Sequence, residues 1–211
     1  MSVETSKILG GVGALLMFIG IIPYINYFGI LELVGLILVF VALYNFGSHY
    51  KEGGIFNNAL YGLIMGIVGV VVAVAAAVIA ILTSLTNFLD AIFPAWNGDW
   101  ASLSGMTPNL SNLSFDVIMP FITGAILVFV ILWVFAIISA FFVRRSMIKL
   151  STKSGIGLFS TAGLLLLIGA VFTIIAIGLI LIWISALLIA IAFFRIRAEQ
   201  TQPTTSAAAP T

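Results

Sequence analysis

Four long apolar stretches run through this 211-residue chain and restrict its fold more than any other feature. They cover residues 8–46, 55–89, 117–143 and 156–194. A helix that crosses a hydrocarbon core about 30 Å thick needs roughly 20 apolar residues, so these stretches supply several crossings. Only 7% of the residues are charged, whereas soluble domains carry about a quarter. The chain is therefore predicted to be an integral membrane protein without a sizeable soluble domain.

The apolar stretches are continuous, which indicates transmembrane helices. Strands of a membrane β-barrel would alternate between apolar and polar residues over about ten positions. The first and last stretches are about twice as long as one crossing requires, so we expect each to form a helical hairpin. The predicted fold is an all-α bundle of six transmembrane helices, at residues 8–22, 28–46, 55–89, 117–143, 156–171 and 174–194.

The two hairpin turns differ in how clearly the sequence marks them. Pro23 cannot donate a backbone hydrogen bond inside a helix, and Tyr24 and Tyr27 suit a turn at the membrane interface. The later turn, near Phe172 and Thr173, is predicted from length alone.

The charges predict an orientation in the membrane. With six crossings, all eight Lys and Arg residues fall on one face: Lys7, Lys51, Arg144, Arg145, Lys149, Lys153, Arg195 and Arg197. The other face holds Asp90, Asp99 and Asp116. Because cytoplasmic loops of membrane proteins are enriched in Lys and Arg, both termini are predicted to be cytoplasmic.

The predicted membrane domain covers residues 1–199, with an external loop at about residues 90–116. Asn109 and Asn112 begin two glycosylation acceptor patterns in this loop. Modification of these asparagines and an unmodified polar loop are both open. Residues 200–211, which read QTQPTTSAAAPT, are too poor in apolar residues to fold and are predicted to be a disordered cytoplasmic tail.

Small residues recur along the third predicted helix at alternating spacings of three and four. They are Ala59, Gly62, Gly66, Gly69, Ala73, Ala76, Ala80 and Thr83. Such a stripe lets another helix backbone approach closely, and this contact drives helix association in lipid. The stripe predicts either a face for association with another molecule or packing within the chain against the fourth or sixth helix.

A basic cluster follows the fourth predicted helix, made of Arg144, Arg145, Lys149 and Lys153. A basic residue near an anionic membrane surface gains about 1 kcal/mol, so these side chains are predicted contacts for phospholipid headgroups. Their role in setting the orientation of the chain explains the cluster equally well.

The residue types needed for catalysis are scarce. The chain has one histidine and no cysteine. It contains no zinc-protease helix motif, phosphate-binding loop, dinucleotide fingerprint or Gly-x-Ser-x-Gly elbow. We therefore expect no enzyme activity, no metal site, no cofactor and no nucleic-acid partner.

Glu32 is the one ionisable residue inside a predicted crossing, four residues beyond its start. Charged groups in hydrocarbon are costly and often functional. Two interpretations are open: a solvated or hydrogen-bonded structural carboxylate, or a site that binds a proton or cation.

The first and last hairpins resemble each other. When they are aligned without gaps, Gly20 matches Gly169 and Gly29 matches Gly178. An internal repeat is predicted, with both copies in the same orientation because four crossings separate them.

Several segments also resemble a known family. They read GALLMFIG, LVGLILVFVALYNF, YKEGGIFNNALYGLIMGIVGVV and GLLLLIGAVFTIIAIGLILIWISALLIAIAFF. The chain is similar in these segments to the archaeal multi-pass membrane family called domain of unknown function 996, and KEGGIFNNALYG at residues 51–62 is the most distinctive part. The resemblance implies residence in an archaeal plasma membrane, and it supplies no activity.

Two functional hypotheses follow. The first is a structural or accessory membrane protein, surrounded by the lipid bilayer, that associates with itself or with another membrane protein through small-residue helix faces. The alternative is a small transporter or channel for a proton, an ion or a small solute, with Glu32 as its site.

Overall fold

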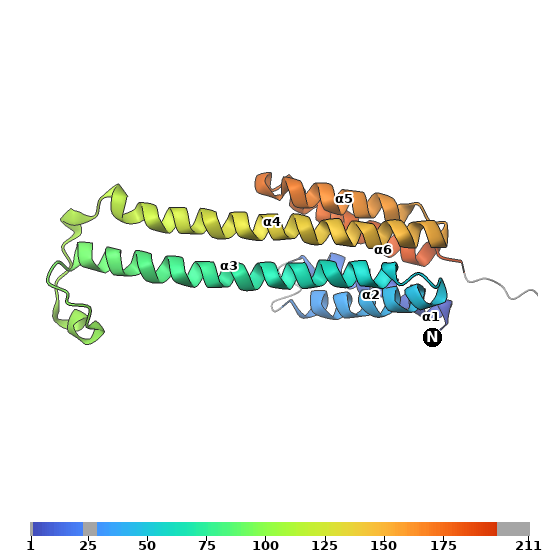
Figure 1. Ribbon diagram of the computed structural model, residues 1–211, viewed down its shortest axis with the longest axis horizontal. Coiled ribbons are helices and arrows are strands. Elements are labelled where there is room, and N and C mark those ends of the chain that lie inside the picture. Colours follow the sequence, from blue (N-terminus) through green and yellow to red (C-terminus); the bar gives the residue numbers. More distant parts are fainter. Residues whose placement is uncertain (1, 23–28, 198–211) are drawn as a thin grey trace, which may run out of the picture. The chain divides into compact units, whose positions relative to one another are not determined.

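The computed structural model describes residues 2–22 and 29–197. The predicted turn at Pro23 and the predicted tail at 200–211 lie outside these residues. Six α-helices follow one another (Figure 1): α1 (Val3–Gly20), α2 (Ile30–His49), α3 (Gly54–Ile92), α4 (Phe115–Ser154), α5 (Leu158–Phe172) and α6 (Ile177–Arg195). The described residues contain no strand. With α5 extended by the turn that follows it, all six are long and apolar enough to cross a membrane. The predicted all-α fold with six such helices is confirmed.

The fourth helix is longer than its hydropathy predicts. It continues past Val143 through the basic cluster to Ser154. Residues such as Arg, Met, Lys and Leu in this segment favour a helix, although they are not all apolar. Gly155 ends the helix with a left-handed backbone, φ 72°, a conformation that glycine adopts without steric cost.

The described chain divides into two compact units. Unit 1 is made of Met1–Asn57, Arg145–Leu165 and Trp183–Thr211. In it α1 and α2 are antiparallel and approach closely, because a Cβ on Gly13 would lie only 2.6 Å from the carbonyl oxygen of Gly35. Phe193 of α6 is fully buried and forms ring contacts with the buried Phe46 and Phe159.

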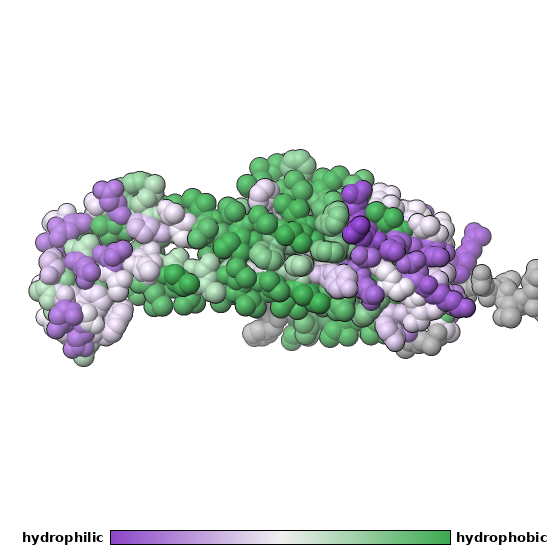
Figure 2. Space-filling model, viewed as in Figure 1, coloured by the Kyte–Doolittle hydropathy of each residue, from purple (hydrophilic) through white to green (hydrophobic). Residues whose placement is uncertain are grey.

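Several helix ends and one loop of unit 1 lie together at one end of the unit. The start of α1, the α2–α3 loop, the start of α5 and the end of α6 lie together there (Figure 1). This end is largely hydrophilic (Figure 2). Unit 1 contains every Lys and Arg residue except Arg144: Lys7, Lys51, Arg145, Lys149, Lys153, Arg195 and Arg197.

Unit 2 is made of Asn58–Arg144 and Leu166–Ile182. Its parts of α3 and α4 run antiparallel and are joined by residues 93–114 (Figure 1), which include the short 3₁₀ helices Trp100–Gly105 and Leu110–Asn112. Hydrophobic side chains cover the middle of these two helices, and hydrophilic ones cover much of the connecting segment (Figure 2).

The turn between α5 and α6 also belongs to unit 2. It is a 3₁₀ helix at Thr173–Ile175, followed by Ala176 with a left-handed backbone, so the turn predicted from length alone is confirmed. Gly169 and Gly178 face each other beside it, because a Cβ on Gly169 would lie 2.9 Å from the Gly178 carbonyl oxygen. Gly29, the counterpart of Gly178 in the first hairpin, instead precedes α2 with φ 68°. The matched glycines therefore have different local roles.

Candidate functional sites

An ion pair connects the α2–α3 loop to the basic end of α4 within unit 1. The Lys149 Nζ donates a hydrogen bond of 2.7 Å to Glu52 Oε1. The Lys149 ammonium, through this bond and through its charge, holds the pKa of the Glu52 carboxyl below its usual value of 4.5. One of the four basic side chains predicted to contact lipid therefore already has an acidic partner.

The segment KEGG around this ion pair forms a tight turn in which Gly54 lies close to Lys149. Lys51 adopts a positive φ of 51°, and the Glu52 amide donates to the Gly47 carbonyl over 2.9 Å. A Cβ on Gly54 would lie 2.6 Å from Lys149 Nζ, so a larger residue there would displace the ammonium. Ser146 of α4 also donates a hydrogen bond to the carbonyl of Ile55, the second residue of α3. The most distinctive segment of the sequence thus anchors α4 to the start of α3.

Glu32 lies nearer to the end of its helix than predicted. It is the third residue of α2, in the first helical turn, and its side chain is half-buried. The amino-terminal end of a helix favours negative charge, because its backbone N–H groups point outward there. Within the part of the chain that the structure describes, Glu32 forms no ion pair. Its role as a proton or cation site stays a prediction.

The small-residue stripe of α3 contacts α4 within unit 2. A Cβ on Gly62 would lie 2.8 Å from Val143 Cγ2, and a Cβ on Gly69 would meet the Phe135 side chain. Ser139 of α4 donates a hydrogen bond of 2.8 Å to the Gly62 carbonyl. At these positions the stripe packs within the chain, the second of its two predicted roles. Its remaining predicted members lie along the same helix: Ala59, Gly66, Ala73, Ala76, Ala80 and Thr83.

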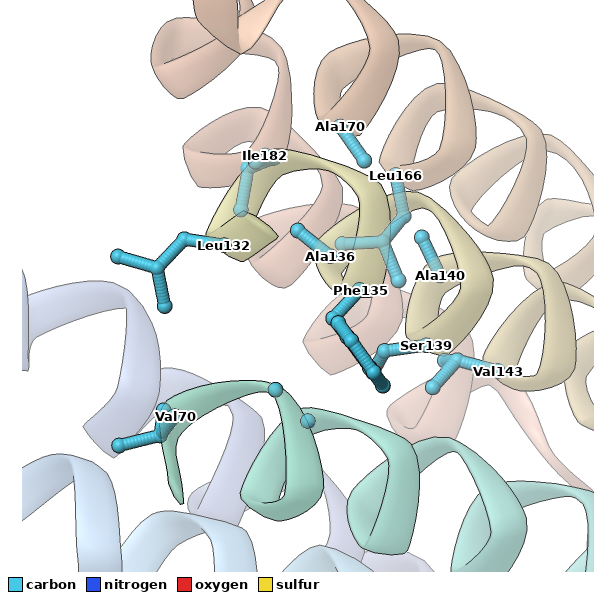
Figure 3. Close-up of a pocket in the computed structure, with 12 residues that line it drawn as sticks. Val70, Leu132, Phe135, Ala136, Ser139, Ala140, Val143, Leu166, Ala170 and Ile182 are labelled. Atoms are coloured by element: carbon cyan, nitrogen blue, oxygen red, sulfur yellow. The ribbon is translucent and has the colours of Figure 1, made fainter. Parts of the chain in front are cut away.

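A cavity of about 400 Å³ interrupts this packing (Figure 3). Side chains from α4 and from the α5–α6 hairpin surround it, and Gly66, Gly69 and Val70 of α3 form its other wall. Small residues lie on both sides of the gap, Gly66 and Gly69 on α3 and Ala136 and Ala140 on α4, beside larger ones such as Phe135. Small side chains on two facing helices leave this space unfilled.

A second, smaller hollow of about 240 Å³ lies elsewhere between α3 and α4 of unit 2. Its walls include the small residues Ala77, Ala80, Gly124 and Ala125. Gly124 packs on Ala80, since a Cβ on Gly124 would lie 2.8 Å from the Ala80 Cβ, whereas Ala125 is exposed. The hollow is therefore open at the side of Ala125.

Two tryptophans that the sequence did not single out satisfy carbonyl groups at helix ends. In unit 2, Trp133 of α4 donates its indole N–H to the Val171 carbonyl over 3.1 Å, next to the end of α5. In unit 1, Trp183 of α6 donates to the Phe18 carbonyl over 2.9 Å, near the end of α1, and stacks on the Phe18 ring. The last carbonyls of a helix lack partners within that helix. In the sequence, the only sign of these two contacts is an isolated Trp within an apolar run.

The predicted glycosylation positions lie in the segment that joins α3 to α4. Asn109 and Asn112 are exposed. The Asn109 Oδ1 accepts a hydrogen bond from the Ser111 amide, and Asn112 Nδ2 donates to the Ala91 carbonyl over 3.2 Å. Modification stays a prediction. No group of three or more His, Cys, Asp or Glu side chains placed to hold a metal ion occurs in the described ranges.

These observations define the class of protein: an α-helical, multi-pass membrane protein with six apolar helices among its described residues. The comparisons then give the family. Residues 31–187 match the family described as protein of unknown function (DUF996). The chain belongs to this family, which confirms the resemblance stated above.

The chain is also similar to an uncharacterized protein of Methanocaldococcus jannaschii. The two are 26% identical over 194 residues, which cover 92% of this chain and 93% of the relative. The similarity therefore extends over nearly the whole of both proteins. No solved structure matches the chain.

Proposed function

We propose that the protein is a structural or accessory protein of the plasma membrane, without enzyme activity, that associates with a second copy of itself through the hollow at Ala77, Ala80, Gly124 and Ala125. This hollow is the observation that carries the proposal. In lipid, apolar side chains gain little by leaving the hydrocarbon, so helices associate where small residues let their backbones approach.

The hollow suits association better than the rest of the small-residue stripe does. Val143 and Phe135 of the same chain already cover the stripe at Gly62 and Gly69. At Ala77 and Ala125 the described residues leave an open groove with Phe121 and Val128 on the α4 side. A helix of a second copy fits such a groove because it is apolar and has small residues along it.

The orientation proposed for this assembly has both termini in the cytoplasm. Its support is the collection of basic residues in unit 1 together with the absence of Lys and Arg from residues 58–143. A transporter is less well supported, because the residues around the larger cavity include no ionisable side chain and Glu32 lies in the first turn of its helix.

The test is the oligomeric state of the full chain in lipid nanodiscs or liposomes. Ala77→Leu and Ala125→Leu fill the hollow, so each is expected to reduce the fraction of dimers several-fold, as measured by chemical cross-linking and single-molecule photobleaching. Ala75→Leu is the matched control, because Ala75 is exposed on the same helix and lines neither hollow. A monomer at every protein-to-lipid ratio, or dimers unaffected by both substitutions, would contradict the proposal.

A further inference from the structure

The larger cavity of unit 2 is lined almost entirely by carbon. Its one hydroxyl belongs to Ser139, which already donates to the Gly62 carbonyl. Figure 3 shows the α4 side chains from Leu132 to Val143 along one side of the space. These two residues are eleven positions apart, about 17 Å along a helix. A site with this lining and length suits an extended hydrocarbon chain and offers nothing to a polar solute.

Arg144 follows Val143 directly and is also part of unit 2. It lies four positions beyond Ala140, which lines the cavity, and residues four apart share one face of a helix. Arg144 does not line the cavity itself, but it follows the last cavity-lining residue of α4 directly, at the end of that segment nearest to the basic cluster.

The Arg144 side chain has a buried hydrogen-bond donor for which the described residues supply no acceptor. Its Nε atom is buried and has no hydrogen-bond partner among the described residues. A buried donor without an acceptor is unfavourable, and such a group in a native protein calls for an explanation such as a bound ion or ligand. Arginine binds phosphate through paired N–H donors. A phosphate oxygen that reached this side chain would give the donor its acceptor.

We propose that Arg144 and the cavity together bind an anionic phospholipid of the surrounding bilayer, with its phosphate on the guanidinium group and one acyl chain in the cavity. The guanidinium group suits the charged phosphate, and the apolar cavity suits the acyl chain. A free phosphate ion would use Arg144 alone and leave the cavity empty, and an uncharged lipid would use the cavity alone. This site is separate from the hollow at Ala77 and does not depend on self-association.

The experiment measures lipid retained by the full chain. The purified protein in detergent is titrated with dioleoyl phosphatidylglycerol or dioleoyl phosphatidylcholine, and bound lipid is counted by native mass spectrometry. We expect one phosphatidylglycerol to bind in preference to phosphatidylcholine. Arg144→Gln should weaken that binding about fivefold or more, the effect of one basic residue at an anionic surface. Arg145→Gln, which removes the same charge one position away, should change it much less.

The cavity is tested separately from the charge. A Cβ on Gly66 would lie 3.6 Å from Ser139 Oγ, an ordinary contact, so Gly66→Leu can enter the cavity without a backbone clash. Ala136→Leu fills it from α4 and serves if the first variant does not fold, as judged by circular dichroism and gel filtration. A folded cavity-filling variant should lose the bound phosphatidylglycerol, and the exposed Ala75→Leu should keep it.

Three results would overturn the proposal. The first is equal binding of the two lipids by the unmodified protein. The second is full retention of phosphatidylglycerol in Arg144→Gln or in a folded cavity-filling variant. The third is displacement of the lipid by millimolar inorganic phosphate, which would show a site for a free anion.

Discussion

At the scale of single residues, Glu52 and Lys149 explain why the segment KEGG is distinctive. They are 97 positions apart in the chain and come together at the α2–α3 loop. The pair is partly exposed, with 27% of the Glu52 and 43% of the Lys149 side chain accessible. Exposed ion pairs contribute little to stability because water screens them. We therefore assign this pair a role in holding the end of α4 in place, and only a small part of the overall stability.

The pair predicts a pH dependence with a definite sign. Because the folded-state pKa of Glu52 is lowered by Lys149, the stabilisation is present above the usual carboxyl pKa of 4.5 and is lost as the pH falls through the folded-state value. Glu52→Gln should thus lower the thermal unfolding temperature slightly at pH 7 and make little difference at pH 3. Unfolding in detergent, followed by circular dichroism at both pH values, measures this.

The charge swap is the matched control for this prediction. The double variant Glu52→Lys with Lys149→Glu should recover most of the unfolding temperature at pH 7, because it restores the attraction with reversed signs. A difference between Glu52→Gln and the unmodified protein that is equal at pH 7 and pH 3 would show that the ion pair is not its cause.

At the scale of elements, the α5–α6 turn lies beside the middle of the part of α4 that belongs to unit 2. Trp133 contacts the carbonyl next to the end of α5. Along α4, Trp133 is eleven residues from Arg144, about 17 Å, and 18 residues from Phe115, about 27 Å. A hydrocarbon core of about 30 Å that begins near Arg144 would place this turn close to the bilayer centre. The exposed side chains of the turn agree, because they include Phe172, Ile174 and Ile175.

Hydrogen bonds within the protein make such a turn tolerable in lipid. The Ala176 amide donates to the Thr173 carbonyl, and the Thr173 hydroxyl donates to the Gly169 carbonyl. Non-helical backbone within a membrane needs partners of this kind, because lipid supplies none. We therefore expect the α5–α6 hairpin to enter the hydrocarbon and return without reaching the opposite surface.

Cysteine labelling tests this depth, because the chain has no native cysteine. A cysteine introduced as Ile175→Cys should resist water-soluble maleimides applied from both sides of the membrane. The control Ser104→Cys, in the exposed segment that joins α3 to α4, should react. Equal rates of reaction at the two positions would place the turn at a membrane surface and contradict the expectation.

The elements also show what the sequence was able to predict. Hydropathy identified all six helices because a membrane crossing requires a long apolar run, and it located the turn at Thr173. It missed the end of α4, since residues 144–154 are helical without being apolar. The Glu52–Lys149 pair, the Trp133 contact and the cavity depend on which helices are neighbours. Hydropathy carries no information on that choice.

At the scale of the whole molecule, the charge distribution carries the proposed orientation. The basic residues lie in unit 1 and at Arg144, and Asp90, Asp99 and Asp116 lie in the part of unit 2 around the α3–α4 connection. Translocation of Lys and Arg across the membrane is disfavoured, so the basic end should stay in the cytoplasm. An α5–α6 hairpin that entered the membrane only part of the way would leave this expectation unchanged, because a segment that enters the membrane and returns keeps its two ends on one side.

The orientation predicts opposite labelling of two single-cysteine variants in intact cells. Ser104→Cys should react with a membrane-impermeant maleimide from outside, and Thr152→Cys, exposed at the basic end of α4, should react only after permeabilisation. Fluorescence of the labelled protein after gel electrophoresis is the readout, with the cysteine-free chain as the blank. If Thr152→Cys reacted first, Arg144 would face the outer surface, and the phosphate that it is proposed to bind would have to come from the outer leaflet. The side of labelling therefore decides which leaflet should supply the lipid in the binding experiment.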